Sequence, residues 1–237
     1  MCKRHSILIG SFLLFAIVSV VFLLASPQKK ETEPTVIFAE QWGGFERTFI
    51  EHMMQADNNH RWRSAYDVEA KNQRVTVYIG IKVIPVKGAD RVLVEKKKNI
   101  QWLNGIEQKW NNRLKLKFAD GSTWPIYIQP YFTVVNPHHE VIVRENGGRP
   151  NQNNWYETTS GPVVAHEVGH MLGAYDEYHL GALDLATGLV DQYSLMGVNP
   201  EAGQVHPRHL ERMLTEIKQL TGLVDLRIIT EINSAES

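Results

Sequence analysis

Residues 160–176 read Ser-Gly-Pro-Val-Val-Ala-His-Glu-Val-Gly-His-Met-Leu-Gly-Ala-Tyr-Asp. The interpretation of the whole chain depends on this stretch. Ser160 or Gly161 can cap a helix, and Pro162 suits its first turn, where a missing N–H costs nothing. Gly173 can end the helix, because glycine readily adopts the positive φ that turns the chain back. The pattern therefore predicts a helix over about residues 161–172.

Two histidines of this helix have the spacing of metal ligands. His166 and His170 are four residues apart, so their imidazoles lie on one face and can grip a single ion. Glu167 projects beside them and can accept the proton of a metal-bound water as a general base. The turn at Gly173 can deliver Asp176 as a third ligand. Two histidines and one carboxylate suit Zn²⁺ and leave one coordination position for water.

The third ligand has alternatives. Glu177 follows Asp176 directly and offers a second carboxylate. A glutamate further downstream, such as Glu201 or Glu211, would instead give a gluzincin arrangement. Gly173 and a possible turn around Met196 favour Asp176.

These residues resemble the signature of the metzincin metallopeptidases, H-E-x-x-H-x-x-G-x-x-[H/D]. The aspartate in the third slot looks like the snapalysin-type variant, and Ser194-Leu195-Met196-Gly197 is similar to the methionine turn beneath the metal. The resemblance implies a zinc-dependent endopeptidase whose substrate lies extended along an edge strand of the sheet. Astacin-like members place a tyrosine just after the methionine of the turn as an extra ligand. This sequence departs from them, because position 198 is Val and Tyr193 precedes the methionine. Tyr178 and Tyr193 could each hydrogen-bond the tetrahedral intermediate.

The fold class expected from the remaining pattern is α+β. The resemblance implies a twisted mixed sheet packed with a long helix and the metal helix, and a small C-terminal subdomain with the methionine turn and a final helix. Alternating apolar residues predict strands at 74–83, 114–118, 126–135 and 141–144. Helices are expected at 90–111, capped by Asp90, and at 207–220. Pro130 demotes the third strand to an edge or a bulge, and residues 145–157 have the composition of a loop.

The charge and cysteine content exclude several classes of function. Of the 25 basic and 26 acidic residues, four basic and no acidic ones lie in the first 30 positions, so the remainder carries a net charge of −5. A mildly acidic domain has no electrostatic footprint for nucleic acid. Cys2 is the only cysteine, which excludes an internal disulfide, a thiolate metal site and a cysteine nucleophile in the globular part.

The N-terminal residues 1–28 are expected to be a membrane anchor or a signal peptide. An uncharged apolar run from Ser6 to Ala25 is long enough for a bilayer core, and Leu23 or Leu24 stands where cleavage wants a small residue. Residues 29–36 read as a tether and 37–237 as the metallopeptidase domain. We expect a single-pass membrane protein with this domain outside the cytoplasm. The alternative is secretion after cleavage.

The sequence thus predicts a zinc metallopeptidase that acts on a peptide or protein substrate. A rival interpretation is a non-catalytic binding or envelope-assembly module on a peptidase scaffold. A second rival keeps the zinc chemistry and acts on a non-protein amide. The substrate, activation control and oligomeric state do not follow from the sequence.

Overall fold

The structure is a computed structural model that describes residues 45, 48–57, 59–145 and 147–231. The predicted N-terminal anchor or signal peptide and the tether lie outside these residues. No helix within the described part of the chain is long and apolar enough to cross a bilayer.

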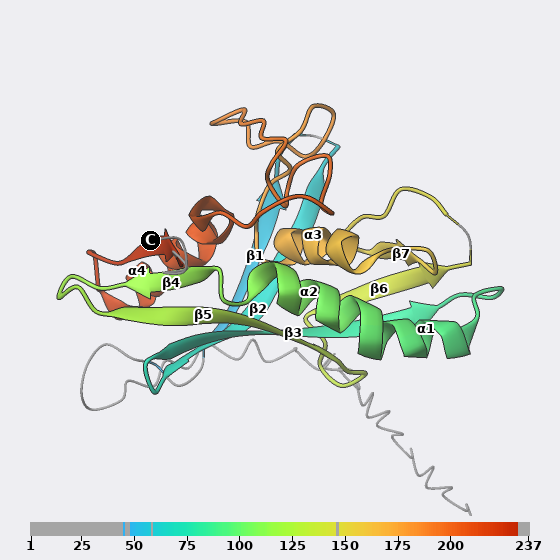
Figure 1. The fold of residues 1–237 in the computed structure, drawn as a ribbon, viewed down its shortest axis with the longest axis horizontal. Coiled ribbons are helices and arrows are strands. Elements are labelled where there is room, and N and C mark those ends of the chain that lie inside the picture. The colour runs from blue at the N-terminus through green and yellow to red at the C-terminus, as the bar shows by residue number, and fades with distance from the viewer. Residues whose placement is uncertain (1–44, 46–47, 58, 146, 232–237) are drawn as a thin grey trace, which may run out of the picture. The chain divides into compact units, whose positions relative to one another are not determined.

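The described residues form a mixed α+β fold, as the sequence predicts (Figure 1). The strands are β1 (Thr48–Gln55), β2 (Arg61–Lys71), β3 (Arg74–Pro85), β4 (Leu114–Lys117), β5 (Thr123–Phe132), β6 (His139–Arg144), β7 (Asn154–Tyr156) and β8 (Arg227–Thr230). The helices are α1 (Arg91–Lys97), a π-helix (Lys98–Trp102), α2 (Leu103–Trp110), α3 (Gly161–Met171), a 3₁₀ turn (Pro207–Leu210) and α4 (Glu211–Thr221).

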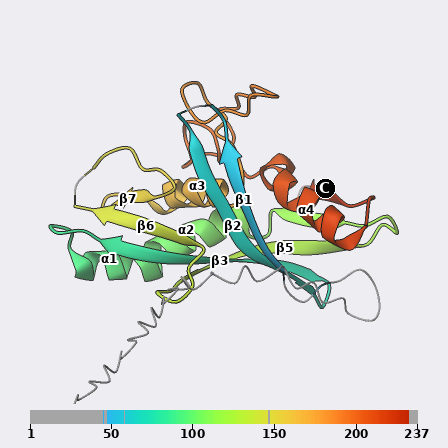
Figure 2. The ribbon, with the colours of Figure 1, turned by 180° about the vertical axis from the view of Figure 1, so that it is seen from behind.

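β3 is the central strand of a curled mixed sheet. It pairs in parallel with β5 on one side and with β6 further along the chain, and β6 pairs in parallel with β7. β2 pairs with β3 only through its C-terminal residues 67–71, and its N-terminal part diverges from β3. The β1–β2 hairpin, which the sequence pattern left unassigned, rises past α3 and leaves the line of the sheet (Figure 2). The hairpin therefore lies beside α3 and forms a wall next to it.

Pro130 is expected at an edge or a bulge, and the part of β5 around it is an edge. β5 pairs with β4 only at residues 123–125, so at Pro130 it has β3 as its single neighbour. The nitrogen of Ile128 faces away from β3 and donates to Asn111 Oδ1 at 2.8 Å. Successive peptides alternate in a strand, so the Pro130 nitrogen faces the same unpaired side.

The long helix lies where the sequence predicts it. Asp90 caps it as expected, because its side chain accepts the N–H groups of Val92 and Leu93. The π-helix inserts a wider turn, which rotates the preceding residues relative to a continuous α-helix. Within this turn Ile100 is 56% exposed and Trp102 is fully buried, and Ile106 and Trp110 of α2 continue the buried face.

Two tryptophans of this long helix hold α3. Trp102 Nε1 donates to the Thr159 carbonyl and Trp110 Nε1 donates to the Ala165 carbonyl, each at 3.0 Å. α2 and α3 also approach closely, since a β-carbon at Gly105 would lie 2.3 Å from the Cα of Gly161. α3 is thereby held in place against α2 (Figure 1).

Candidate metal centre

α3 begins and ends as its sequence predicts. Ser160 caps its N-terminus and accepts the N–H of Val163. Gly173 has φ +94° and turns the chain after the last helical residue. The helix is almost entirely buried, and this burial includes the three polar side chains of the motif, His166, Glu167 and His170. Buried polar groups of this kind need partners or a function.

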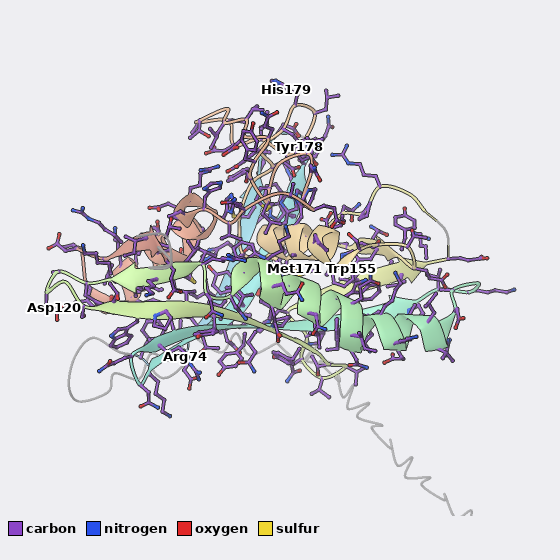
Figure 3. The ribbon with its side chains drawn as sticks, in the orientation of Figure 1. Arg74, Asp120, Trp155, Met171, Tyr178 and His179 are labelled. Carbon is purple, nitrogen blue, oxygen red and sulfur yellow. The ribbon has the colours of Figure 1, made fainter. Side chains whose placement is uncertain are left out.

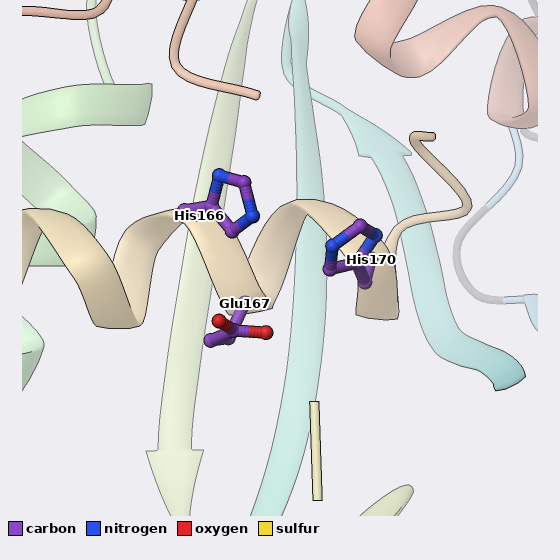
Figure 4. A group of neighbouring side chains, drawn as sticks. All are labelled: His166, Glu167 and His170. Carbon is purple, nitrogen blue, oxygen red and sulfur yellow. The ribbon is translucent and has the colours of Figure 1, made fainter. Parts of the chain in front are cut away.

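The two histidines are oriented for ligation. His166 Nδ1 lies 2.9 Å from the Leu195 carbonyl, and His170 Nδ1 lies 2.9 Å from the Ala174 carbonyl. A carbonyl oxygen can only accept, so each Nδ1 carries a proton and Nε2 is the atom of each neutral ring that can bind a metal. Both rings project from the same side of the helix, with Glu167 on another side (Figure 4). Ligand atoms of His166, Glu167 and His170 all lie within 4.8 Å of one another.

Asp176 completes this group. Its Oδ1 lies 3.2 Å from Nε2 of His166 and 3.3 Å from Nε2 of His170. Its Oδ2 accepts the N–H of Ala182 at 2.7 Å, which fixes the carboxylate. Gly181 permits this fold of the chain, because a β-carbon there would lie 2.6 Å from the Cβ of Asp176.

The three residues fit a zinc ion. Tetrahedral zinc with ligands at about 2.0–2.1 Å separates its ligand atoms by about 3.3 Å, which matches the O···N distances of 3.2 and 3.3 Å. Asp176 Oδ1 is buried without a regular hydrogen bond. With both Nδ1 atoms protonated, the two Nε2 lone pairs and this oxygen face one another, an arrangement that a cation stabilises. Asp176 thus adds a carboxylate oxygen to the His166, Glu167 and His170 group whose ligand atoms lie together.

The same three donors also attract protons. Burial lowers the pKa of His170, but the Asp176 and Glu167 carboxylates outweigh burial and raise that pKa to about 9. Burial likewise acts to raise the pKa of Asp176, yet the two imidazoles hold it well below its usual range. Metal and protons thus compete for the same three donors.

Glu167 is the other unpaired carboxylate of the centre. It is 4% exposed, and its Oε2 is buried without a hydrogen-bond partner. Burial is the main cause that raises its pKa, and the neighbouring imidazoles oppose it. A carboxylate with a raised pKa and a free oxygen beside a metal site has the properties of a general base.

Met196 lies beneath the helix, between the two histidine positions. A β-carbon at Gly169 would be 2.3 Å from its sulfur, so only glycine lets the methionine approach this closely. Its N–H bonds Ser194 Oγ and its carbonyl accepts the N–H of Glu177. The turn over 194–197 therefore supports both the His166 ring, through Leu195, and the segment that carries the third carboxylate.

The other candidate third ligands face elsewhere. Glu177 accepts two hydrogen bonds from the Arg208 guanidinium, at 2.7 and 2.8 Å, and lies 3.4 Å from His209. Glu201 accepts from the Ser160 hydroxyl. Glu211 is exposed on α4. The arrangement favours Asp176 as the third donor.

A cleft of about 490 Å³ opens over the centre. One wall is the turn of the β1–β2 hairpin at residues 59–62, and the other is the loop at residues 149–154. Trp62 connects the first wall to α3, because its Nε1 donates to the His170 carbonyl at 3.0 Å. Gln152 joins the second wall to β2 by donating to the Arg63 carbonyl.

Tyr178 and Arg149 lie at the mouth of this cleft. Figure 3 shows Tyr178 in the loop above α3. The Arg149 guanidinium donates to the Tyr178 hydroxyl at 2.5 Å and lies 5.4 Å from the centre of its ring. Tyr193, the other tyrosine considered from the sequence, is 73% exposed and does not line the cleft.

Sequence reasoning missed Arg149 and Trp62. Arg149 stands in a segment recognised only as a loop, and Trp62 in a region with no assigned element. Neither position has a periodic pattern that connects it to the histidine motif, so nothing in the sequence pointed to either residue.

None of the family models, the curated proteins or the solved structures compared with this chain gave a match.

Proposed function

We propose that this chain is a zinc-dependent peptidase of metzincin type, in which His166, His170 and Asp176 hold the ion. The supporting observation is the convergence of Nε2 of His166, Nε2 of His170 and Oδ1 of Asp176 at zinc-ligand spacing. Glu167 is the general base. The substrate is a peptide or protein that lies in the cleft between the hairpin and the 149–154 loop.

A bound Zn²⁺ lowers the pKa of a coordinated water and polarises a substrate carbonyl. Glu167 accepts the proton of the attacking water at its free oxygen. Because burial raises the pKa of this carboxyl, it can hold the proton and then pass it to the leaving amine. The walls of the cleft limit the access of other water.

Tyr178 supplies a neutral hydrogen-bond donor. Burial, the largest cause, and the Asp176 charge raise its pKa to about 12, so the hydroxyl keeps its proton near neutral pH. Arg149 donates to the hydroxyl oxygen, so the O–H itself remains a donor; it faces Asp176 in this structure and would turn to the developing oxyanion of the substrate.

The element order supports the metzincin assignment. The strand β3 is followed by the long helix, by the four strands β4 to β7 and by α3, and then by the Met196 turn and α4. The β1–β2 hairpin departs from the expected pattern, since β2 contributes residues to the cleft from before the first core strand. The outer edge of β7 makes turn bonds of its own, between Asn154 and Asn151. An extended substrate therefore has no free edge on β7, contrary to the simplest form of the resemblance.

Glu167 argues against a purely binding role. An unpaired buried carboxylate costs stability, on the order of 1–3 kcal/mol or more, and a docking module gains nothing from it. A zinc amidase that acts on a non-protein amide shares every residue role and differs only in the substrate.

The test is Glu167→Gln in the whole chain. The substitution keeps the shape and removes the base, so turnover should fall at least about a hundredfold. Zinc content should stay at the wild-type level, and the melting temperature should be equal or higher, because a buried charge is lost. Glu107→Gln on the exposed side of α2 is the matched control. Full activity of Glu167→Gln on a peptide that the wild type cleaves would disprove the mechanism.

We further propose that the N-terminal apolar run anchors the chain and places the catalytic domain outside the cytoplasm. The support is the length of the uncharged run and the poor cleavage site in the sequence. Fractionation should recover the chain in membranes with residue 1–28 sequence still attached. A mature form in the soluble fraction that begins near residue 26 would show a cleaved signal peptide instead.

A further inference from the structure

The walls of the cleft have an unusual chemical balance. Outside the centre itself, and apart from Trp62, Pro150, Tyr178 and Ala182, the lining residues carry amide or basic side chains, and none carries a carboxylate. The amides are Asn59, Asn151, Gln152, Asn153 and Asn154, and the basic residues are His60, Arg61 and Arg149. The two fully charged side chains come from opposite walls, Arg61 from the hairpin turn and Arg149 from the facing loop.

These two arginines differ from others nearby. Arg63 pairs with Glu51, Arg208 with Glu177 and Arg212 with Glu216. Among the described residues, no carboxylate forms an ion pair with Arg61 or Arg149. An unpaired guanidinium in a cleft is available for an anion, and its planar fork matches a carboxylate in a two-bond geometry.

Arg149 is also held in position. One of its NH₂ groups donates to the Tyr178 hydroxyl and its guanidinium lies against the Tyr178 ring. The remaining N–H donors are left for a ligand. This anchoring reduces the entropy that a flexible side chain loses when it binds.

Metal binding makes the charge of the cleft positive. The charge of one Zn²⁺ is matched by the Asp176 and Glu167 carboxylates, so these groups together contribute no net charge. Arg61 and Arg149 then remain uncompensated in the cleft. Such a field attracts anionic substrates and repels cationic ones.

We propose that the cleft selects substrates with a carboxylate close to the scissile bond, bound by Arg149 and, from the other wall, by Arg61. The inference rests on the proposed peptidase function and names its substrate class. The carboxylate belongs to an Asp or Glu side chain or to the C-terminus of the peptide. The experiment below separates these two sources.

The test uses the zinc-loaded whole chain in detergent and one fluorogenic peptide with Glu, Gln or Lys flanking the cleaved bond. The Glu peptide should exceed the Gln peptide in kcat/KM by about tenfold or more, as a charge-assisted hydrogen bond provides, and the Lys peptide should be the poorest. Each peptide is made with a free and an amidated C-terminus. A side-chain carboxylate predicts equal rates for the two forms, whereas a terminal carboxylate predicts a loss on amidation.

Arg149→Gln should reduce the preference for Glu over Gln to about twofold or less, and Arg149→Glu should favour the Lys peptide. Arg61→Gln should have a smaller effect, because no hydrogen bond or ion pair with another described residue fixes the exposed Arg61 side chain. Arg91→Gln is the control, since Arg91 is exposed and lines neither wall. Binding of the same peptides to Glu167→Gln protein, measured by fluorescence anisotropy, gives a readout that does not depend on catalysis.

The outcomes separate this inference from the proposed function. Equal cleavage of the Glu and Gln peptides by the wild type, in both terminal forms, would overturn the inference and leave the peptidase standing. A preference that survives in Arg149→Gln and in Arg61→Gln would also overturn it. If nothing is cleaved but the anisotropy shows tighter binding of the carboxylate peptide that is lost in Arg149→Gln, carboxylate recognition stands and the peptidase proposal fails.

Discussion

Asp176 and Glu177 are neighbours in the sequence and are buried to a similar extent, at 6% and 5% exposure, yet their carboxylates have different partners. Asp176 lies between the two imidazoles of α3 with one oxygen unpaired. Glu177 is fully engaged by Arg208, and by His209 from the turn that precedes α4. In the proposed function Asp176 binds a zinc ion from solution, whereas Glu177 is neutralised by the Arg208 side chain of the chain itself.

Backbone geometry, more than residue type, separates the two. Asp176 makes an isolated bridge with Leu183, and the Glu177 N–H bonds the Met196 carbonyl. Consecutive side chains of an extended segment point to opposite sides, so one carboxylate faces α3 and the other faces the turn before α4. Either residue could serve as a ligand chemically, but only one is aimed at the histidines.

The largest expected effect is that of Asp176→Ala. It removes one of three zinc donors, so zinc affinity should fall by at least about a hundredfold and activity should drop to background. Competition titration against a chromogenic chelator measures the affinity. Wild-type zinc affinity in this variant would show that Asp176 is no ligand.

A smaller effect should follow from Gly181→Ala, which leaves all three donors in place. The new methyl group would press on the Asp176 side chain, within 2.6–2.8 Å of its Cβ, Cγ and Oδ2. Zinc affinity should weaken by about tenfold, in the range of supporting-residue substitutions. Gly147→Ala is the control, because a β-carbon there meets nothing closer than 3.8 Å. Equal affinities for the two variants would argue against a fixed Asp176.

Glu177→Gln should affect stability and leave zinc in place. The substitution weakens a buried pair with Arg208, at a cost of about 1–3 kcal/mol. That cost corresponds to a melting temperature lower by roughly 2–12 °C for a domain of this size. Thermal unfolding of the metal-free and zinc-loaded forms measures both properties. A loss of zinc with an unchanged melting temperature would reverse the assignments of the two carboxylates.

The smallest effect is a pH dependence of the same pair. Burial acts to raise the pKa of Glu177, but hydrogen bonds from Arg208 and His209 outweigh it and hold the pKa below the ordinary 4.5. A lowered pKa in the folded state adds stability above about pH 4.5, which is lost as the pH falls toward the folded-state value. The difference in unfolding free energy between metal-free wild type and Glu177→Gln should therefore shrink below pH 4.5. A constant difference between pH 7 and pH 3 would contradict this account of the pair.

Much of the fold could be predicted because local signals agree with the structure. The strand from Arg74, the Asp90 cap, the Ser160 cap and the Gly173 turn each have a local physical cause. The β1–β2 hairpin could not be predicted in this way. Its buried face is created by contacts with the end of α3, as when Ser64 Oγ donates to the Met171 carbonyl, and sequence periodicity does not report such contacts.

The candidate site likewise contains residues that local sequence signals predict and residues that they do not. The residues of α3 follow from helical spacing, and Asp176 follows from the turn at Gly173. The fate of Glu177 depends on Arg208, which is 31 residues away in the sequence, and the place of Arg149 depends on how two loops meet. The π-helix over Lys98–Trp102, which exposes Ile100 and buries Trp102, is a local irregularity for which the sequence carries no clear marker.

Zinc content of the purified whole chain tests the central claim most directly. Elemental analysis after zinc supplementation and removal of loosely bound metal should find about one zinc per chain in wild type and in Glu177→Gln, and almost none in Asp176→Ala. Wild-type protein without any transition metal would contradict the zinc centre. Zinc that persists in Asp176→Ala and disappears from Glu177→Gln would contradict the division of roles between the two carboxylates.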